Sequence, residues 1–301
     1  MSNESKSLFS DMEDLGFGDI KNINLYQQPE DDEKMDDEKK SPLQDSVKKE
    51  IELLYDKKVI CPVCDNLVYA KSVKVSAPRI VKKDSDLFIR YASVNPYFYD
   101  VWLCNNCGYA AMKKDFLNIK DYQHDQVLRQ ITVRWKGRIY PEVYDVDIAI
   151  ERYKLSLLNY VAINAKHSSK AMNCLKIAWM YRLKGDESNE MEFLKQALEG
   201  LEHAYLEESF PIYGMDRFTT MYLIGELNRR VGDFDKAMQW FSKVITTPAV
   251  NPKLKELARD QKDLIKSAKK EENTFEDNNS SNKKTGFFKS LFKGKKHNSQ
   301  E

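Results

Sequence analysis

The sequence has little cysteine and no long apolar run. Only five of its 301 residues are cysteines, far below the content of a secreted domain held together by disulfides. No apolar stretch approaches the roughly 18 residues that a transmembrane helix needs. The first residues also lack the basic-then-apolar layout of a signal peptide. We therefore expect a cytoplasmic protein, in a compartment where thiols stay reduced.

Familiar enzyme signatures are absent as well. The chain has no phosphate-binding loop, no dinucleotide-binding glycine pattern, no G-x-S-x-G elbow and no H-E-x-x-H motif. Its four histidines are scattered, without a nucleophile or a metal-spaced partner nearby in the sequence: His124, His167, His203 and His297. His203 has Glu199, Glu202 and Glu207 around it, which is typical of a solvated surface histidine. We expect no catalysis and no small-molecule substrate, although residues distant in the sequence can converge in a fold.

The net charge of +1 conceals opposite charges at the two ends. Residues 1–50 hold 14 Asp or Glu against 7 Lys, whereas residues 283–296 hold six Lys and no acid. Few apolar side chains accompany these charges to offset the entropy of ordering the chain. We predict a disordered acidic arm over residues 1–50 and a disordered basic tail over residues 271–301.

Each of these arms contains one short amphipathic segment. In the acidic arm Leu8, Met12 and Leu15 have helical spacing, which predicts either a docking helix that folds on a partner or a fraying tail. The basic tail places four large apolar side chains opposite lysines: Phe287, Phe288, Leu291 and Phe292. This pattern suits weak, reversible contact with the inner face of an anionic membrane. A docking peptide and a solvated tail are the alternatives.

Four of the cysteines form two C-x-x-C pairs, Cys61 with Cys64 and Cys104 with Cys107. Four thiolates in two such corners can hold one tetrahedral Zn²⁺ and leave no coordination position open, as in structural sites. The competing interpretation is redox chemistry, because Cys61-Pro62-Val63-Cys64 has the C-P-x-C form of dithiol oxidoreductases. No βαβ pattern follows this motif, and the second pair supplies the two missing ligands. The sequence therefore favours structural zinc bound by all four cysteines.

Residues 51–118 predict a small β module around these cysteines. Alternation at 73–77 and aromatic or β-branched runs at 87–91 and 98–103 predict short strands. The 39 residues between Cys64 and Cys104 exceed the roughly 15–20 of a compact zinc ribbon, so we expect an inserted hairpin or strand. A domain this small has a thin core, and zinc is its expected staple. Removing the zinc is predicted to unfold this module while the helices persist.

Helical patterns replace strand patterns over residues 119–270. A broad apolar face predicts one helix, and four more helices follow as two pairs: 147–164, 171–183, 191–206, 219–230 and 234–245. A Gly-Asp turn joins the members of each pair, at Gly185-Asp186 and Gly232-Asp233. This spacing resembles the tetratricopeptide repeat, although the two turns are 47 residues apart rather than 34. The fifth cysteine, Cys174, is predicted to be a small buried apolar residue.

Nucleic-acid binding is the alternative to a protein-binding function. Residues 68–120 hold nine Lys or Arg, among them Lys82, Lys83 and Arg90, against four Asp. Four aromatic residues could offer stacking faces to bases: Tyr91, Phe98, Tyr99 and Trp102. Aromatic residues that alternate in a small sheet are, however, more typical of its core. The charge excess is also modest for a chain of nearly neutral pI.

Three sequence motifs carry a resemblance to a known family. They are Cys61-Pro62-Val63-Cys64, the segment 95–110 that contains the second cysteine pair, and Ala178-Trp179-Met180-Tyr181-Arg182 followed by Gly185-Asp186. Together they resemble an uncharacterised bacterial family, domain of unknown function 2225, over roughly residues 55–265. The resemblance implies a four-cysteine zinc ribbon joined to tetratricopeptide-like helices, and it brings no established activity.

These observations lead to one prediction of fold and function. The fold class is α+β, a zinc-ribbon-like β module followed by an all-α tetratricopeptide-like domain, with disordered tails. The predicted function is that of a non-enzymatic, zinc-binding adaptor whose helices present a groove to a protein or peptide partner.

Overall fold

The computed structural model describes the backbone of residues 49–278 and the side chains as far as Lys269. Strands come first and pair into three antiparallel hairpins: β1 (Leu54–Ile60) with β2 (Leu67–Val73), β3 (Ile80–Lys83) with β4 (Ile89–Tyr91), and β5 (Val101–Leu103) with β6 (Ala110–Met112). Helices follow: α2 (Asp121–Val127), the π-helical turn η3 (Leu128–Thr132), α3 (Val146–Ala162), α4 (His167–Lys184), α5 (Glu187–Glu207), α6 (Arg217–Val231), α7 (Phe234–Thr246) and α8 (Pro252–Asn278). The predicted order of β hairpins and helices is confirmed.

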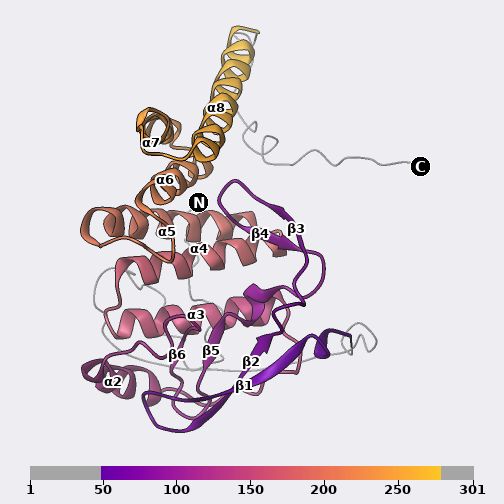
Figure 1. The fold of residues 1–301 in the computed structure, drawn as a ribbon, viewed down its shortest axis with the longest axis vertical. Coiled ribbons are helices and arrows are strands. Elements are labelled where there is room, and N and C mark those ends of the chain that lie inside the picture. The colour runs from indigo at the N-terminus through magenta and orange to yellow at the C-terminus, as the bar shows by residue number, and fades with distance from the viewer. Residues whose placement is uncertain (1–48, 279–301) are drawn as a thin grey trace, which may run out of the picture.

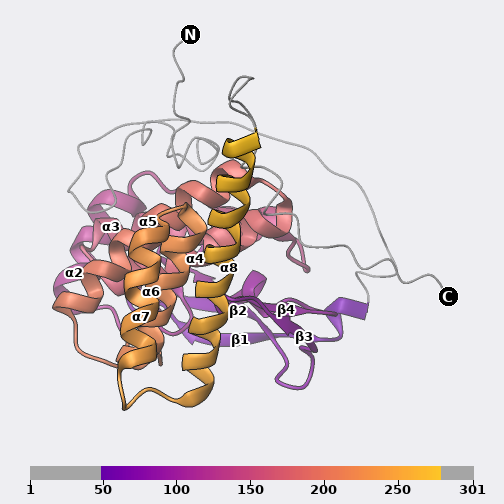
Figure 2. The ribbon, with the colours of Figure 1, turned by 90° about the horizontal axis from the view of Figure 1, so that it is seen from above.

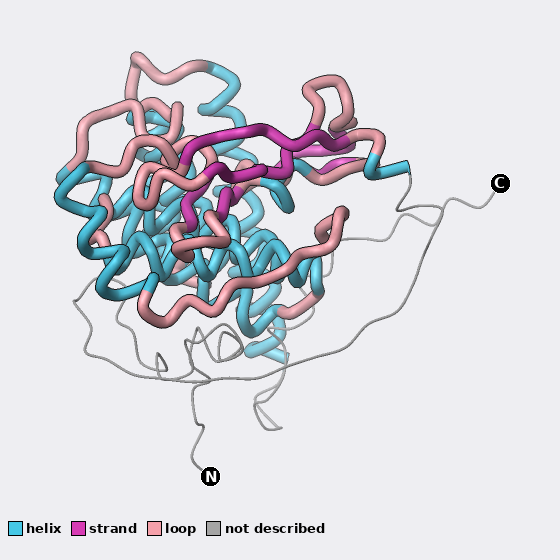
Figure 3. The backbone as a smooth tube through the Cα atoms, turned by 90° about the horizontal axis from the view of Figure 1, so that it is seen from below, coloured by secondary structure: helices cyan, strands magenta, loops and turns pink. Residues whose placement is uncertain are grey.

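The helices stack from one end of the molecule to the other. Figure 1 shows β1, β2, β5 and β6 beside α3, and α8 projecting at the opposite end. Seen from above, the strands β1–β4 lie along one side of the helices (Figure 2). Seen from below, the strands lie over one face of the helices (Figure 3). In the part of the chain that the structure describes, no helix combines the length and the apolar composition that crossing a membrane requires.

The two predicted Gly-Asp turns end one helix and begin the next. Gly185 and Gly232 have positive φ angles of 79° and 90°, the left-handed conformation that glycine adopts without strain at a helix C-terminus. The Asp186 side chain then accepts a hydrogen bond from the backbone N of Asn189 at 3.1 Å, and Asp233 does the same with Lys236 at 3.1 Å. The predicted helix pairs α4–α5 and α6–α7 are therefore confirmed, with ends that extend a few residues further.

The strands and the helices share one hydrophobic core. Trp102 on β5 and Ala111 on β6 belong to the same buried cluster as Tyr153 on α3 and Trp179 on α4. Cys174 is fully buried in this cluster, as predicted. A second cluster lies between α6, α7 and α8. A third, smaller cluster contains Leu54, Tyr99 and Tyr144 and lies beside β1. Most buried side chains of the hairpins nevertheless belong to the cluster that they share with the helices.

Two of the predicted strands are wrong in part. The run at 73–77 does not alternate in a sheet: β2 ends at Val73, and Val75 is 99% exposed in the following turn. The run at 98–103 begins as the 3₁₀ helix η2 (Pro96–Tyr99), and only Val101–Leu103 pairs as a strand. Asn95 causes this start, because its side chain accepts the backbone N–H of Tyr97 while Pro96 has no N–H to donate.

The long insert between the two cysteine pairs forms the β3–β4 hairpin, as predicted in outline. Its tip, residues 84–88, reaches away from the cysteines and lies against α4 and α6. The Asp86 carboxylate is fully buried and accepts hydrogen bonds from Arg182 at 2.6 Å and from the Trp179 indole at 3.0 Å. Phe88, also fully buried, stacks on Trp179 with ring centroids 5.2 Å apart. The insert is therefore a structural arm between the β region and the helices.

Arginines from two helices neutralise this buried tip. Burial by itself would raise the pKa of Asp86, but the positive charges of Arg230 and Arg182 outweigh it and lower the pKa. Ser85 donates a hydrogen bond at 2.6 Å to Glu226, which is itself paired with Arg229 and Arg230 on α6. Removing one member of such a buried network leaves an uncompensated charge, which is strongly destabilising.

Candidate metal centre

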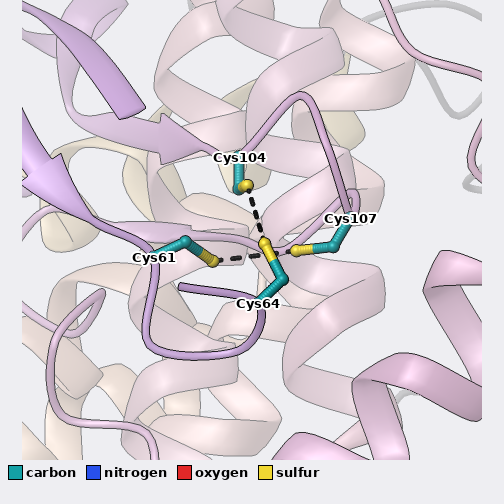
Figure 4. Close-up of side chains that lie close together, drawn as sticks. All are labelled: Cys61, Cys64, Cys104 and Cys107. Atoms are coloured by element: carbon teal, nitrogen blue, oxygen red, sulfur yellow. Dashed lines mark hydrogen bonds between the residues drawn. The ribbon is translucent and has the colours of Figure 1, made fainter. Parts of the chain in front are cut away.

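The four predicted cysteine ligands converge on one point. The Sγ atoms of Cys61 and Cys107 are 3.7 Å apart, those of Cys64 and Cys104 are 3.5 Å apart, and all four lie within 4.8 Å of one another. Figure 4 shows the side chains pointing toward a common centre from two separate loops. All four thiols are free, so neither pair forms a disulfide. The fold therefore brings together the complete set that the sequence predicts.

The sulfur geometry fits a tetrahedral metal ion. Thiolates bound to zinc at roughly 2.3 Å form a tetrahedron whose edges are about 3.8 Å long. The two shortest sulfur–sulfur distances come close to this edge, whereas a disulfide would need about 2.05 Å. Cys61, Cys104 and Cys107 are buried, and Cys64 is partly exposed. These four residues could thus hold one metal ion with no protein position left open.

Both loops have the same backbone framework, which we call the first knuckle (residues 61–66) and the second knuckle (residues 104–109). In each, the N–H of the first cysteine donates to the carbonyl of the sixth residue, at 2.9 Å for Cys61 and 2.8 Å for Cys104. The fifth residue closes each turn with positive φ, 57° at Asp65 and 74° at Gly108. This turn directs both cysteine side chains of a knuckle to the same side.

Hydrogen bonds between the thiols shift their pKa values in opposite directions. Hydrogen bonds from Cys107 and Cys61 lower the pKa of Cys104 to about 2, because they stabilise its thiolate. The same bonds keep protons on the donors, so hydrogen bonding to Cys104 raises the pKa of Cys61 to about 12. Binding a divalent metal replaces these protons, and metal uptake is accordingly coupled to proton release.

Two asparagines beside the cysteines donate weak hydrogen bonds to sulfur. The side-chain nitrogen of Asn66 is 3.5 Å from the Cys64 Sγ, and that of Asn106 is 3.6 Å from the same atom. Such contacts stabilise thiolate charge and orient a ligand. The sequence alone did not predict these two contacts. The position of Asn66 and Asn106 within or beside a C-x-x-C pair was the one sequence feature that could have indicated them.

The second knuckle is fastened to the helical region by three side chains. Thr132 donates a hydrogen bond to the Cys107 carbonyl at 2.8 Å, Asn159 on α3 donates to the Gly108 carbonyl at 3.2 Å, and the Trp135 indole donates to the Asn105 carbonyl at 2.9 Å. These residues follow the knuckle at variable distances in the sequence and carry no motif. Only the fold shows that they support the site.

Several of the residues proposed for nucleic-acid contact take part in packing or ion pairs. Tyr99 and Trp102 are 2% and 4% exposed, so their interpretation as core residues is confirmed. Arg90 forms two close hydrogen bonds to Asp84, at 3.0 and 2.8 Å, and Lys82 lies 3.6 Å from the same carboxylate. The predicted membrane segment at 286–296 and the docking segment around Met12 lie outside the described residues.

One histidine from another part of the chain reaches His203. His203 is exposed, and its Nδ1 lies 3.1 Å from Glu207, in agreement with a surface role. The His167 ring stacks on the His203 ring with centroids 4.9 Å apart. The i,i+4 spacing of His203 and Glu207 was visible in the sequence, whereas the approach of His167 depends on how α4 packs against α5.

Comparison with other proteins identifies a family and no activity. No curated protein and no solved structure matches the chain. A family model matches residues 54–265, from β1 into α8, and this stretch includes both knuckles and the β3–β4 arm. The chain therefore belongs to the family described as an uncharacterized protein conserved in bacteria, domain of unknown function 2225.

Proposed function

We propose that the protein is a non-enzymatic adaptor in which one structural Zn²⁺ joins the two knuckles and the helical region binds a partner protein. Four cysteine ligands would occupy every position of a tetrahedral ion, which is the arrangement of structural sites. Thiolates are soft ligands and favour Zn²⁺ over Mg²⁺ or Ca²⁺. Protein purified without chelators is expected to contain tightly bound zinc, and the absence of any metal would contradict this part of the proposal.

The β3–β4 tip limits where a partner can bind. The sequence predicts a groove without placing it on particular helices. In a stack of helix pairs, one such groove would lie along the first helix of each pair, α4 and α6. Residues 84–88 of the chain already pack there: Asp86 is bonded to Trp179 and Arg182, and the Tyr222 hydroxyl donates to the Ser85 carbonyl at 2.9 Å. An external peptide would have to displace this buried, charge-paired tip. We therefore assign partner binding to a helical surface that residues 84–88 do not cover.

Exposed apolar side chains on α8 are the main observation in favour of a partner-binding surface. Leu257 and Leu264 are 42% and 55% exposed, whereas their neighbours Ala258 and Ile265 are buried against α6 and α7. The two leucines are seven positions apart and thus lie on one helix face, separated by roughly 10 Å along the axis. α8 projects from the end of the molecule (Figure 1). α6 and α7 therefore cover only part of the apolar surface of α8.

The charges beside these leucines are of both signs. At 100° per residue, the side of α8 that carries Leu257 and Leu264 also carries Lys253, Glu256, Asp260 and Asp263, whereas the other five cations of residues 252–269 fall on the opposite side. An amphipathic partner helix would complement this surface, because its apolar side chains would cover Leu257 and Leu264 and its polar side chains would face the charges at the rim.

Site-specific photo-crosslinking in native cells tests this surface. A benzoylphenylalanine in place of Leu264 is expected to give a discrete protein adduct whose crosslinked peptide is amphipathic. The same group in place of Val75, 99% exposed between β2 and β3, controls for non-specific capture. Substituting Leu257→Glu should then reduce the adduct from position 264. Equal capture at both positions, or a crosslinked peptide without apolar residues at helical spacing, would contradict the assignment.

A further inference from the structure

We infer that His167, His203 and Glu207 form a second, exposed Zn²⁺ site, independent of the cysteine centre and of the adaptor proposal. The His167 Nε2 lies 3.5 Å from one Glu207 oxygen, and the His203 Nδ1 lies 3.1 Å from the other. One ligand atom from each of the three residues can be chosen so that all lie within 4.8 Å of one another. Among the described residues, this is the one group apart from the four cysteines that meets this spacing.

The distances match those between ligands of a bound zinc ion. Zinc binds histidine nitrogen and carboxylate oxygen at roughly 2.0–2.2 Å, which places neighbouring tetrahedral ligands about 3.3–3.5 Å apart. The two nitrogen–oxygen separations of 3.5 and 3.1 Å are close to this range. The two imidazole rings are stacked with an interplanar angle of 21°. Because the nitrogen lone pairs lie in the ring planes, rotation of the side chains would be needed to turn a nitrogen of each ring toward a common ion.

The backbone positions of the three ligands are well fixed. His203 and Glu207 are one turn apart near the end of α5, and His167 is the first residue of α4. Next to them, Glu208 accepts hydrogen bonds from the Ser168 backbone N–H at 2.9 Å and from the Ser168 hydroxyl at 2.6 Å. This pair of bonds ties the start of α4 to the end of α5. The ligands thus come from two helix ends that are already held together.

Negative charges outnumber positive charges next to the two histidines. Glu207 and Glu208 contribute two carboxylates beside the histidines, and Lys170 contributes the opposing positive charge. Divalent transition metals prefer imidazole and carboxylate ligands in this combination.

This site would differ in kind from the cysteine centre. Three protein ligands leave at least one tetrahedral position for water or for a side chain of another molecule. His203 and Glu207 are exposed, so the ion would exchange readily with the solvent. Bound zinc would clamp the open end of the α4–α5 pair and stabilise the native state by mass action.

Titration of the zinc-loaded, full-length protein with Co²⁺ tests the inference. One further equivalent per chain should bind and give the weak d–d absorption of nitrogen and oxygen ligands, without the intense thiolate charge-transfer band that Co²⁺ at the cysteines would show. His203→Ala and His167→Ala should each weaken this binding by roughly tenfold or more. Adding Zn²⁺ should raise the melting temperature of the wild type and not that of His203→Ala.

Two control variants distinguish the proposed ligands from other surface groups. Glu199→Gln removes an exposed carboxylate one turn before His203, and His297→Ala removes a histidine near the end of the chain. Both should bind the second equivalent as the wild type does. Unchanged circular dichroism would show that His203→Ala, at an exposed position, leaves the fold intact. The inference is overturned if the wild type binds no second equivalent, or if His203→Ala retains it.

Discussion

The two knuckles have the same backbone and different surroundings. Both close with a residue in the left-handed conformation and with equivalent backbone hydrogen bonds. The second knuckle is held from outside by Thr132, Trp135 and Asn159, and both of its cysteines are buried. In the first knuckle, Cys64 is partly exposed. Within the described residues, the hydrogen bonds to its sulfur involve only members of the two knuckles, Asn66, Cys104 and Asn106. Equal ligand sets can therefore have unequal structural support.

This difference indicates what a metal ion would contribute at each knuckle. Residues of both knuckles lie in the shared core, but only the second knuckle is flanked by strands, β5 and β6, that pack directly on α3. We therefore expect α3 to hold the second knuckle in place without an ion. The first knuckle depends more on the ion for its link to the rest of the fold. Metal binding is thus expected to act mainly as a tether for the first knuckle and the β1–β2 hairpin.

Metal removal is expected to have the largest effect and to separate the two knuckles. After chelation, amide hydrogen exchange should accelerate at least about tenfold in residues 59–69, because the ion no longer restrains local opening. Residues 101–112 should keep most of their protection, since β5 and β6 pack directly on α3. Hydrogen exchange with mass spectrometry measures both segments in one experiment.

The sequence alone predicts that zinc removal unfolds all of residues 55–118. The contacts of β5 and β6 with α3 restrict the expected unfolding to the first knuckle and its hairpin. Equal loss of protection in both segments would show that the second knuckle also depends on the metal. The helical circular dichroism signal provides the control, because it should change little if α3 to α8 remain folded. A simultaneous loss of that signal would mean that metal and global stability are coupled.

Substitution of the left-handed residue should have the next largest effect, and it should differ between the knuckles. A Cβ added at Gly108 would lie 2.7 Å from the Trp135 Cγ, and its φ of 74° is unfavourable for alanine. Strain and overpacking together predict that Gly108→Ala lowers the free energy of unfolding by roughly 2–5 kcal/mol. Asp65→Ala, at a φ of 57° in the first knuckle, should cost only about 1 kcal/mol.

Denaturant unfolding of the two zinc-loaded variants measures this difference. Thr132→Val serves as a control, because it removes one hydrogen bond to the second knuckle without adding a clash. Its effect should fall between those of the other two, at about 1–2 kcal/mol. Similar losses for Gly108→Ala and Asp65→Ala would show that the two turns have equal support, contrary to the structure.

The sequence predicted the four candidate ligands because a C-x-x-C pair is a local motif. It did not predict the residues that support the second knuckle, because those contacts join distant parts of the chain. Two C-x-x-C pairs identify four thiolates without knowledge of the fold, and Gly-Asp turns identify helix ends. Asn159 contacts the Gly108 carbonyl only because α3 packs across β5 and β6. The β3–β4 arm was predicted from its length, but its attachment to Arg182 depends on a charge pair between distant residues. Tertiary contacts of this kind leave no periodic pattern in one sequence.

The smallest effect is expected at the asparagines that contact Cys64. The hydrogen bonds from Asn66 and Asn106 to its sulfur are long, at 3.5 and 3.6 Å, and exposed to water. Asn66→Ala and Asn106→Ala should each lower the metal affinity by about tenfold or less, at the weak end of the range for groups that orient a ligand. Competition with a chromophoric chelator measures this change.

Asn105→Ala provides the matched comparison within the second knuckle. The Asn105 side chain does not contact sulfur in the described structure; its oxygen accepts the backbone N–H of Arg138 at 2.7 Å. This variant should therefore reduce protein stability and leave the metal affinity of the remaining folded protein close to that of the wild type. A larger loss of affinity in Asn105→Ala than in Asn106→Ala would mean that contacts outside the knuckles, rather than hydrogen bonds to Cys64, set the strength of metal binding.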